Sequence, residues 1–161
     1  MKLDEILDKV YPWSYTEKIQ GHHYAAKFKT DGGSTVHVVT IIDVSGDTTI
    51  ANVVFMRDHS QSLTGQGDAF KIFSTVVDIV RDTVKQTRPD VIVYAADKGE
   101  QSRVDLYDKM TRKYKPPGYM KIEKMDDIKD PHLKQDLKQW VYEVNGSVDS
   151  EEFALSILVR I

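Results

Sequence analysis

The sequence predicts an α/β protein built on a mixed, mostly antiparallel sheet. Runs rich in β-branched and apolar residues at 24–29, 36–44 and 48–56 are joined by short glycine turns, which is typical of an antiparallel meander. A long segment at 69–88 then places apolar residues at helical spacing. The run 91–97 has few polar interruptions, as expected of a strand with helices on both faces.

The first half of the chain predicts a short helix followed by the meander. Apolar residues recur at helical spacing over 3–10, and Pro12 ends that helix because the residue before a proline is pushed toward extended backbone. Glycine turns at 31–33 and 45–47 separate the strands. We therefore expect three antiparallel strands after the helix.

The long helix links two strands of the same sheet. Asp68 before it and Arg88 at its end suit the helix dipole. Parallel strands need a crossover of this kind, usually a helix. We therefore expect strand 91–97 to pair in parallel with strand 48–56, which makes the sheet mixed.

The rest of the chain predicts one helix, a helical insertion and closing strands. A helix at 101–114 precedes a short strand at 119–124. The segment 126–148 is an insertion with its own helix, and 151–161 alternates as a final strand. We expect residues 1–161 to form a single domain, as their number allows.

Composition excludes several classes of protein. The chain has no cysteine, so disulfides, thiolate nucleophiles and cysteine-bound metals are excluded. A net charge of −3 gives no global argument for a nucleic-acid or anionic-membrane partner. Neither a signal-peptide core nor a run of about 20 apolar residues is present. We expect a soluble cytoplasmic protein with no membrane partner.

Two local motifs, together with the order of elements, carry a family resemblance. Gly65-Gln66-Gly67 opens the long helix, and Leu106-Tyr107-Asp108-Lys109 lies in the next one. Over roughly 24–124 and the last strand, the chain resembles the GNAT acetyltransferase superfamily. The stretch from 65 to 114 is also similar to small tailed-bacteriophage proteins that carry a degenerate version of this domain. The resemblance implies a phage protein in the host-cell cytoplasm.

The resemblance also implies a coenzyme A site at the glycine turn. Backbone N–H groups at such a turn, next to a helix N-terminus, bind a pyrophosphate. Ser62 stands where the family has Arg or Gln, and the Asp68 carboxylate would repel a diphosphate. The alternative is a tight turn that Asp68 caps. The candidate cofactor-binding residues are Gly65, Gln66, Gly67, Asp68 and Ala69.

Tyr107 matches the family tyrosine that protonates the departing coenzyme A thiolate. A phenol does this only within hydrogen-bond reach of the sulfur. The alternative is a ring packed against the sheet beside Met110 and Tyr114. A general base would come from one of three residues that location does not separate: Asp43, Asp58 and His59.

Two further clusters invite a functional interpretation. His22 and His23 lack a third ligand at metal-binding spacing, so we interpret them as loop residues and expect no metal. The segment 109–124 is rich in Lys and Arg and could contact phosphates or an acidic protein. The alternative is a solvated helix end whose cations suit its dipole.

Three functions are compatible with these residues. One is an acetyl-CoA-dependent N-acetyltransferase, with acetyl-CoA as cofactor and Tyr107 as acid. A second keeps the scaffold without the cofactor and binds a protein, as a host-directed anti-defence factor or a virion component. Ser62, Asp68 and Arg103 favour the second. A homodimer fits that interpretation, and nucleic-acid contact ranks last.

Overall fold

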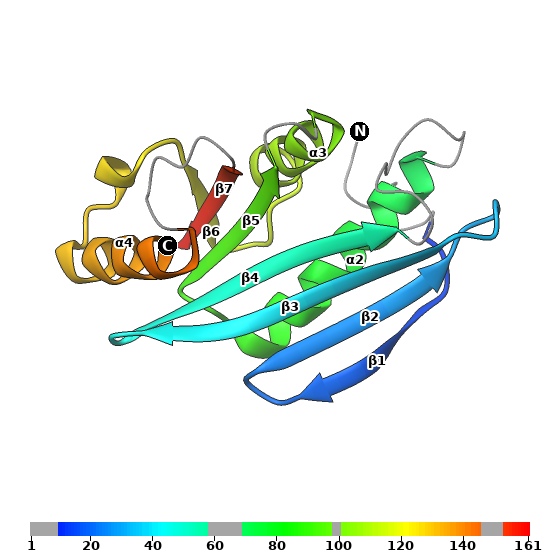
Figure 1. The fold of residues 1–161 in the computed structure, drawn as a ribbon, viewed down its shortest axis with the longest axis horizontal. Helices are drawn as coiled ribbons and strands as arrows, with labels where there is room; N and C mark the ends of the chain where they lie inside the picture. Colours follow the sequence, from blue (N-terminus) through cyan, green and yellow to red (C-terminus); the bar gives the residue numbers. More distant parts are fainter. Residues whose placement is uncertain (1–9, 58–68, 98–100, 146–152) are drawn as a thin grey trace. The chain divides into compact units, whose positions relative to one another are not determined.

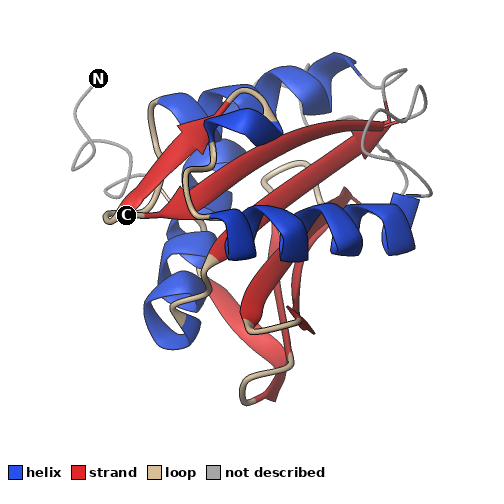
Figure 2. Ribbon diagram, turned by 90° about the vertical axis from the view of Figure 1, so that its left-hand side faces the viewer, coloured by secondary structure: helices blue, strands red, loops and turns tan. Residues whose placement is uncertain are grey.

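The computed structural model describes residues 10–57, 69–97, 101–145 and 153–161. It confirms the mixed α/β class, with helices and strands both well represented (Figure 2). The strands are β1 (Trp13–Ile19), β2 (His23–Lys29), β3 (Thr35–Ser45), β4 (Thr48–Arg57), β5 (Val91–Asp97), β6 (Tyr119–Ile122) and β7 (Phe153–Arg160). The helices are α2 (Ala69–Thr87), α3 (Gln101–Arg112) and α4 (Pro131–Asn145), with a 3-10 turn η1 (Met125–Asp127). Neighbouring strands follow the order β1-β2-β3-β4-β5-β7-β6.

The three predicted strands are present as β2, β3 and β4, and the sequence analysis missed a fourth strand, β1, before them. β1 precedes the predicted strands and pairs antiparallel with β2, from Trp13 opposite Phe28 to Ile19 opposite His23. β1 is an edge strand and most of its side chains are exposed, so its sequence lacks the apolar alternation that marks a strand. The helix predicted at 3–10 lies outside the described residues apart from Val10.

The chain forms two compact units, described separately below. The first comprises Met1–Ile41 and Val54–Arg88, and the second Ile42–Val53 and Pro89–Ile161. In the first unit, β1, β2 and the start of β3 run side by side with α2 behind them (Figure 1). Five side chains of β2 and β3 bury one face of these strands: Tyr24, Ala26, Phe28, Val36 and Val38.

Hydrogen bonds fix α2 to β1 within the first unit. The Trp13 indole N–H donates to Asp78 at 2.8 Å. The Tyr15 hydroxyl donates to Asp82 at 2.6 Å. Burial, followed by that hydrogen bond, raises the pKa of Tyr15, so its phenol stays neutral and keeps donating. The aromatic side chains of β1 therefore lie on the helix side of the strands.

In the second unit, β4 and β5 pair in parallel, as the sequence predicts. Ile50 lies opposite Val91 and Val53 opposite Tyr94. β5 pairs antiparallel with β7, which pairs antiparallel with β6. The mixed sheet therefore follows from the single helical crossover that α2 supplies between β4 and β5.

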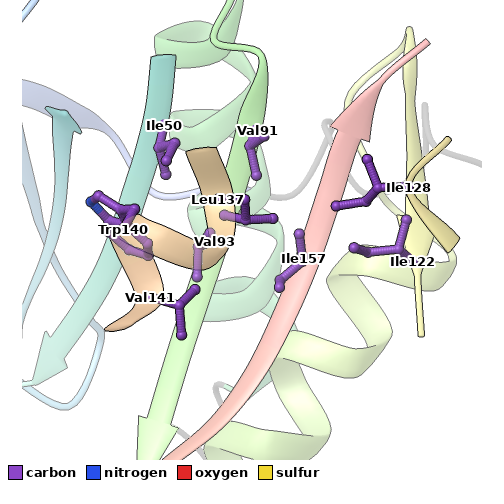
Figure 3. Close-up of a cluster of buried hydrophobic side chains, with 9 residues drawn as sticks. All are labelled: Ile50, Val91, Val93, Ile122, Ile128, Leu137, Trp140, Val141 and Ile157. Atoms are coloured by element: carbon purple, nitrogen blue, oxygen red, sulfur yellow. The ribbon is translucent and has the colours of Figure 1, made fainter. Parts of the chain in front are cut away.

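Helices cover both faces of β5. On one face, a cluster of buried side chains joins α4 to the strands (Figure 3). It contains Ile50, Val91, Val93, Ile122, Ile128, Leu137, Trp140, Val141 and Ile157. On the opposite face, Tyr94 meets Tyr107 of α3, with ring centroids 5.5 Å apart. The apolar run at 91–97 is explained by this double cover.

The predicted insertion contains α4, which is anchored to the turn between β3 and β4. Ser45 Oγ donates to the Asp136 carbonyl oxygen at 2.8 Å, and Thr48 Oγ1 donates to the Asp136 carboxylate at 2.8 Å. Gly46 lies between them with φ +59°, directly against the Asp136 carboxylate. Trp140 Nε1 donates to Asp43 at 2.9 Å. These bonds hold α4 on the strands.

Candidate functional site

The predicted cofactor corner falls mostly outside the described residues. Gly65, Gln66, Gly67 and Asp68 are not described, and of Ala69 only its place as the first residue of α2 is described. Two candidate bases, Asp58 and His59, are not described either. The helix that should follow the corner is therefore confirmed, and the pyrophosphate site stays a prediction.

Tyr107 lies in the interior of the second unit. Its side chain is 1% exposed, and its hydroxyl oxygen is buried. Its ring lies against Tyr94, and Met110 is buried one turn later on the same helix. Burial, and secondarily the phenols of Tyr107 and Tyr119, raise the pKa of Tyr94. These buried, stacked rings are suited to holding α3 on β5.

Two other candidate polar residues, Asp43 and His23, have local partners. Asp43 accepts the Trp140 indole N–H, so it anchors α4. His23 Nδ1 lies 2.7 Å from a Glu17 carboxylate oxygen on the surface of β1 and β2. In the described segments, no group of three or more His, Asp or Glu side chains lies close enough to hold a metal ion.

The basic segment 109–124 is partly neutralised by acids. Lys121 Nζ lies 2.6 Å from the Asp108 carboxylate. Arg112 bridges Asp108 at 2.8 Å and Glu123 at 2.9 Å. The hydrogen bond from Lys121, and then that from Arg112, lower the pKa of Asp108. These pairs leave a weaker field for a phosphate backbone than the sequence count of cations implies.

A surface that the sequence analysis missed lies on the first unit. We define the outer face as the side of β1–β3 opposite α2. We call a rung the set of residues that lie side by side on this face of neighbouring strands. From the lysine end onward, the strand register gives these rungs: Lys29 and Thr35; Ser14, Lys27 and His37; Glu17, Ala25 and Val39; Ile19, His23 and Ile41. Lys27 and Lys29 are exposed, whereas their neighbours Ala26 and Phe28 are buried. Lysines at alternate positions of 24–29 were the sequence signal.

A hollow of about 410 Å³ opens beside the lysine end of the outer face. The strands around the hollow are anchored on their α2 side. Trp13 is held by its bond to Asp78, and the ring of Phe28 stacks on Tyr11 with centroids 5.6 Å apart. The lining residues are Pro12, Trp13, Ser14, Lys27, Phe28, Lys29 and Thr35. On the outer face the hollow therefore combines a proline, two hydroxyl-bearing residues and two lysines, over strands that Trp13 and Phe28 anchor from the α2 side.

Comparison of the chain with protein-family models, with curated proteins and with solved structures gives no match. In the described part of the chain, no helix is long and apolar enough to cross a membrane.

Proposed function

We propose that this chain is a phage-type protein with an acetyltransferase-like fold that acts by binding a protein partner, without using acetyl-CoA. The scaffold part rests on the element order and on the parallel pairing of β4 with β5, which agree with the resemblance seen in the sequence. A host-directed anti-defence factor or a virion component is the biological role that fits it.

The main support for a loss of catalysis is the buried position of Tyr107. A general acid must reach the atom that it protonates. The Tyr107 hydroxyl is enclosed, and its ring is part of the packing between α3 and β5. The Asp68 carboxylate beside the glycine turn supports the same conclusion, since it would repel a diphosphate.

Thermal unfolding with and without acetyl-CoA tests this function. A ligand that binds the native state at about 100 times its Kd adds about 2.7 kcal/mol to stability. We expect no rise in Tm at millimolar acetyl-CoA, with adenosine at the same concentration as the matched control. A rise specific to acetyl-CoA would overturn the proposal.

Tyr107→Phe separates the proposed function from the acyltransferase alternative. The substitution keeps the ring against Tyr94 and removes the hydroxyl. We expect no acetyl-CoA hydrolysis or amine acetylation above background from either protein. Turnover by the parent chain that falls in Tyr107→Phe, with coenzyme affinity unchanged, would establish the N-acetyltransferase instead.

A further inference from the structure

The outer face of β1–β3 is a sheet face that the described part of the first unit leaves open. α2 bonds to the strands from the opposite side, through Asp78 and Asp82. On the outer face, Lys27, Lys29 and Ile41 are exposed, and Val39 is half-buried. An uncovered face that mixes apolar and charged groups has the composition of a recognition surface.

The charge of the outer face is concentrated at one end. Lys27 and Lys29 lie there, beside the hydroxyl-bearing Ser14 and Thr35. Glu17, the acid on this face, lies in a rung toward the other end and is engaged by His23 at 2.7 Å. A ligand at the lysine end therefore meets two ammonium groups, with the acid of this face occupied elsewhere.

The hollow at the same end gives the cations an apolar neighbour. Its volume of about 410 Å³ is large enough for a bulky side chain and its flanking backbone. On this face Pro12 and the aliphatic stems of Lys27 and Lys29 supply the apolar lining. Beneath the hollow, the bond between Trp13 and Asp78 and the stacking of Tyr11 on Phe28 hold the strands in place before any ligand arrives. Such preorganisation lowers the entropic cost of binding.

The geometry points to an acidic segment of a protein partner as the occupant of the outer face. An apolar side chain of that segment fills the hollow, and carboxylates on either side of it pair with Lys27 and Lys29. The inference rests on the proposed protein-binding function and names its surface and the chemistry of the partner.

A nucleic acid is a poorer match to the same face. Its backbone carries a charge at every nucleotide and is bound by a track of cations. The rungs beyond Lys27 continue instead with the Glu17–His23 pair and with the apolar Ala25, Val39 and Ile41. An acidic peptide with an apolar anchor matches both the charged end and the apolar continuation.

Fluorescence anisotropy with defined peptides tests the inference on the full chain. The probe is a short labelled peptide with a Glu-Phe-Glu centre in a Gly-Ser background, and the matched peptides carry Gln-Phe-Gln, Glu-Ala-Glu and Lys-Phe-Lys. We expect the Glu-Phe-Glu peptide to bind at least about tenfold more tightly than the others, and salt to weaken it. Equal binding of all four peptides, or no binding, would overturn the inference.

Charge reversal at the lysines supplies the second arm. The double variant K27E/K29E should lose about tenfold or more in affinity for the Glu-Phe-Glu peptide and gain affinity for the Lys-Phe-Lys peptide. That gain also shows that the variant is folded. The matched control K134E/K138E changes two lysines of α4 in the second unit and should leave both affinities unchanged. A control that loses as much as K27E/K29E contradicts the assignment.

Two outcomes separate this inference from the proposed function. Preferential competition by a single-stranded oligonucleotide at equal charge concentration would assign the face to nucleic acid and reject the acidic peptide. A Tm rise with acetyl-CoA rejects the proposed function whatever the peptides do. If acetyl-CoA gives no rise in Tm and the peptides bind without selectivity, the outer face is rejected as the binding surface and the proposed function stands.

Discussion

The strands of the two units bury their side chains in different patterns. In β5 of the second unit, Val91, Ile92, Val93 and Tyr94 are buried in succession. In β2 of the first unit, buried residues such as Phe28 alternate with exposed or half-buried ones. The first pattern belongs to a strand with helices on both faces, and the second to a strand with a helix on one face.

This difference in burial assigns different roles to the two kinds of strand: one stabilises the core, and the other can bind a partner. A strand covered on both faces contributes all its apolar area to the core and offers no side chains to a partner. A strand covered on one face can place charged groups on the other without weakening the core. Lys27 and Lys29 occupy such positions. We therefore expect substitutions in β5 to change stability and substitutions on the outer face to change binding.

The sharpest test of this comparison uses one substitution at two sites. Val93→Ala removes methyl groups from a fully buried position and should lower the free energy of unfolding by about 2 to 3 kcal/mol. Val39→Ala, on the half-buried outer face, should cost less than about 1 kcal/mol. Urea unfolding of both variants measures the difference. Equal costs would show that the two units do not differ as proposed.

A second test compares two glycine turns. Gly46 and Gly33 both have positive φ, of +59° and +85°. A Cβ on Gly46 would collide with the Asp136 carboxylate, whereas one on Gly33 would meet nothing within 4 Å. Gly46→Ala should cost about 2 kcal/mol and Gly33→Ala about 1 kcal/mol, the ordinary cost of left-handed backbone.

The Asp136→Ala background supplies the control for Gly46. Removing that carboxylate removes the collision, so Gly46→Ala should cost less there than in the parent chain. Thermal unfolding of the four proteins completes the cycle. Strict additivity of the two substitutions would contradict the role of Asp136 as the obstacle.

The smallest expected effect concerns a surface charge of the second unit. Lys121 and Arg112 hold the pKa of Asp108 below its usual range, so its stabilisation is present near neutral pH and is lost as pH falls through the folded-state pKa. Its side chain is 47% exposed, and solvent screening keeps the contribution below about 1 kcal/mol. Asp108→Asn should therefore slightly reduce the loss of unfolding free energy that the parent chain shows as pH falls. The effect should be smaller in a Lys121→Met background, and urea unfolding at a series of acidic pH values measures it.

The sequence predicted those elements that carry a strong periodic signal. The helix at 69–88 matches α2, which begins at Ala69 and ends at Thr87, and the strands at 48–56 and 91–97 match β4 and β5 within a residue. The short strand predicted at 119–124 ends earlier, at Ile122, and the backbone N–H groups of Glu123 and Lys124 donate to the Asp127 carboxylate of η1. Local spacing determines such elements because one face must be apolar whatever it packs against.

Other features depend on partners distant in the sequence. β1 has little apolar pattern of its own, and it is defined by its pairing with β2 and by the bonds of Trp13 and Tyr15 to α2. Alternation along 24–29 puts Ala25, Lys27 and Lys29 on one side of β2, but only the pairing of β2 with β3 shows that Val39 lies beside Ala25 on that side. The strand register and the position of α2 decide which side chains make up the outer face.

The sequence by itself determined the class of fold, the parallel pairing of β4 with β5 and the double cover of β5, because hydrophobic period and crossover length are local properties. The tertiary structure decided that the Tyr107 phenol is enclosed against Tyr94 and that two lysines line a hollow at one end of β1–β3. Both depend on which side chains meet across the fold. That is set by packing between segments far apart in the chain.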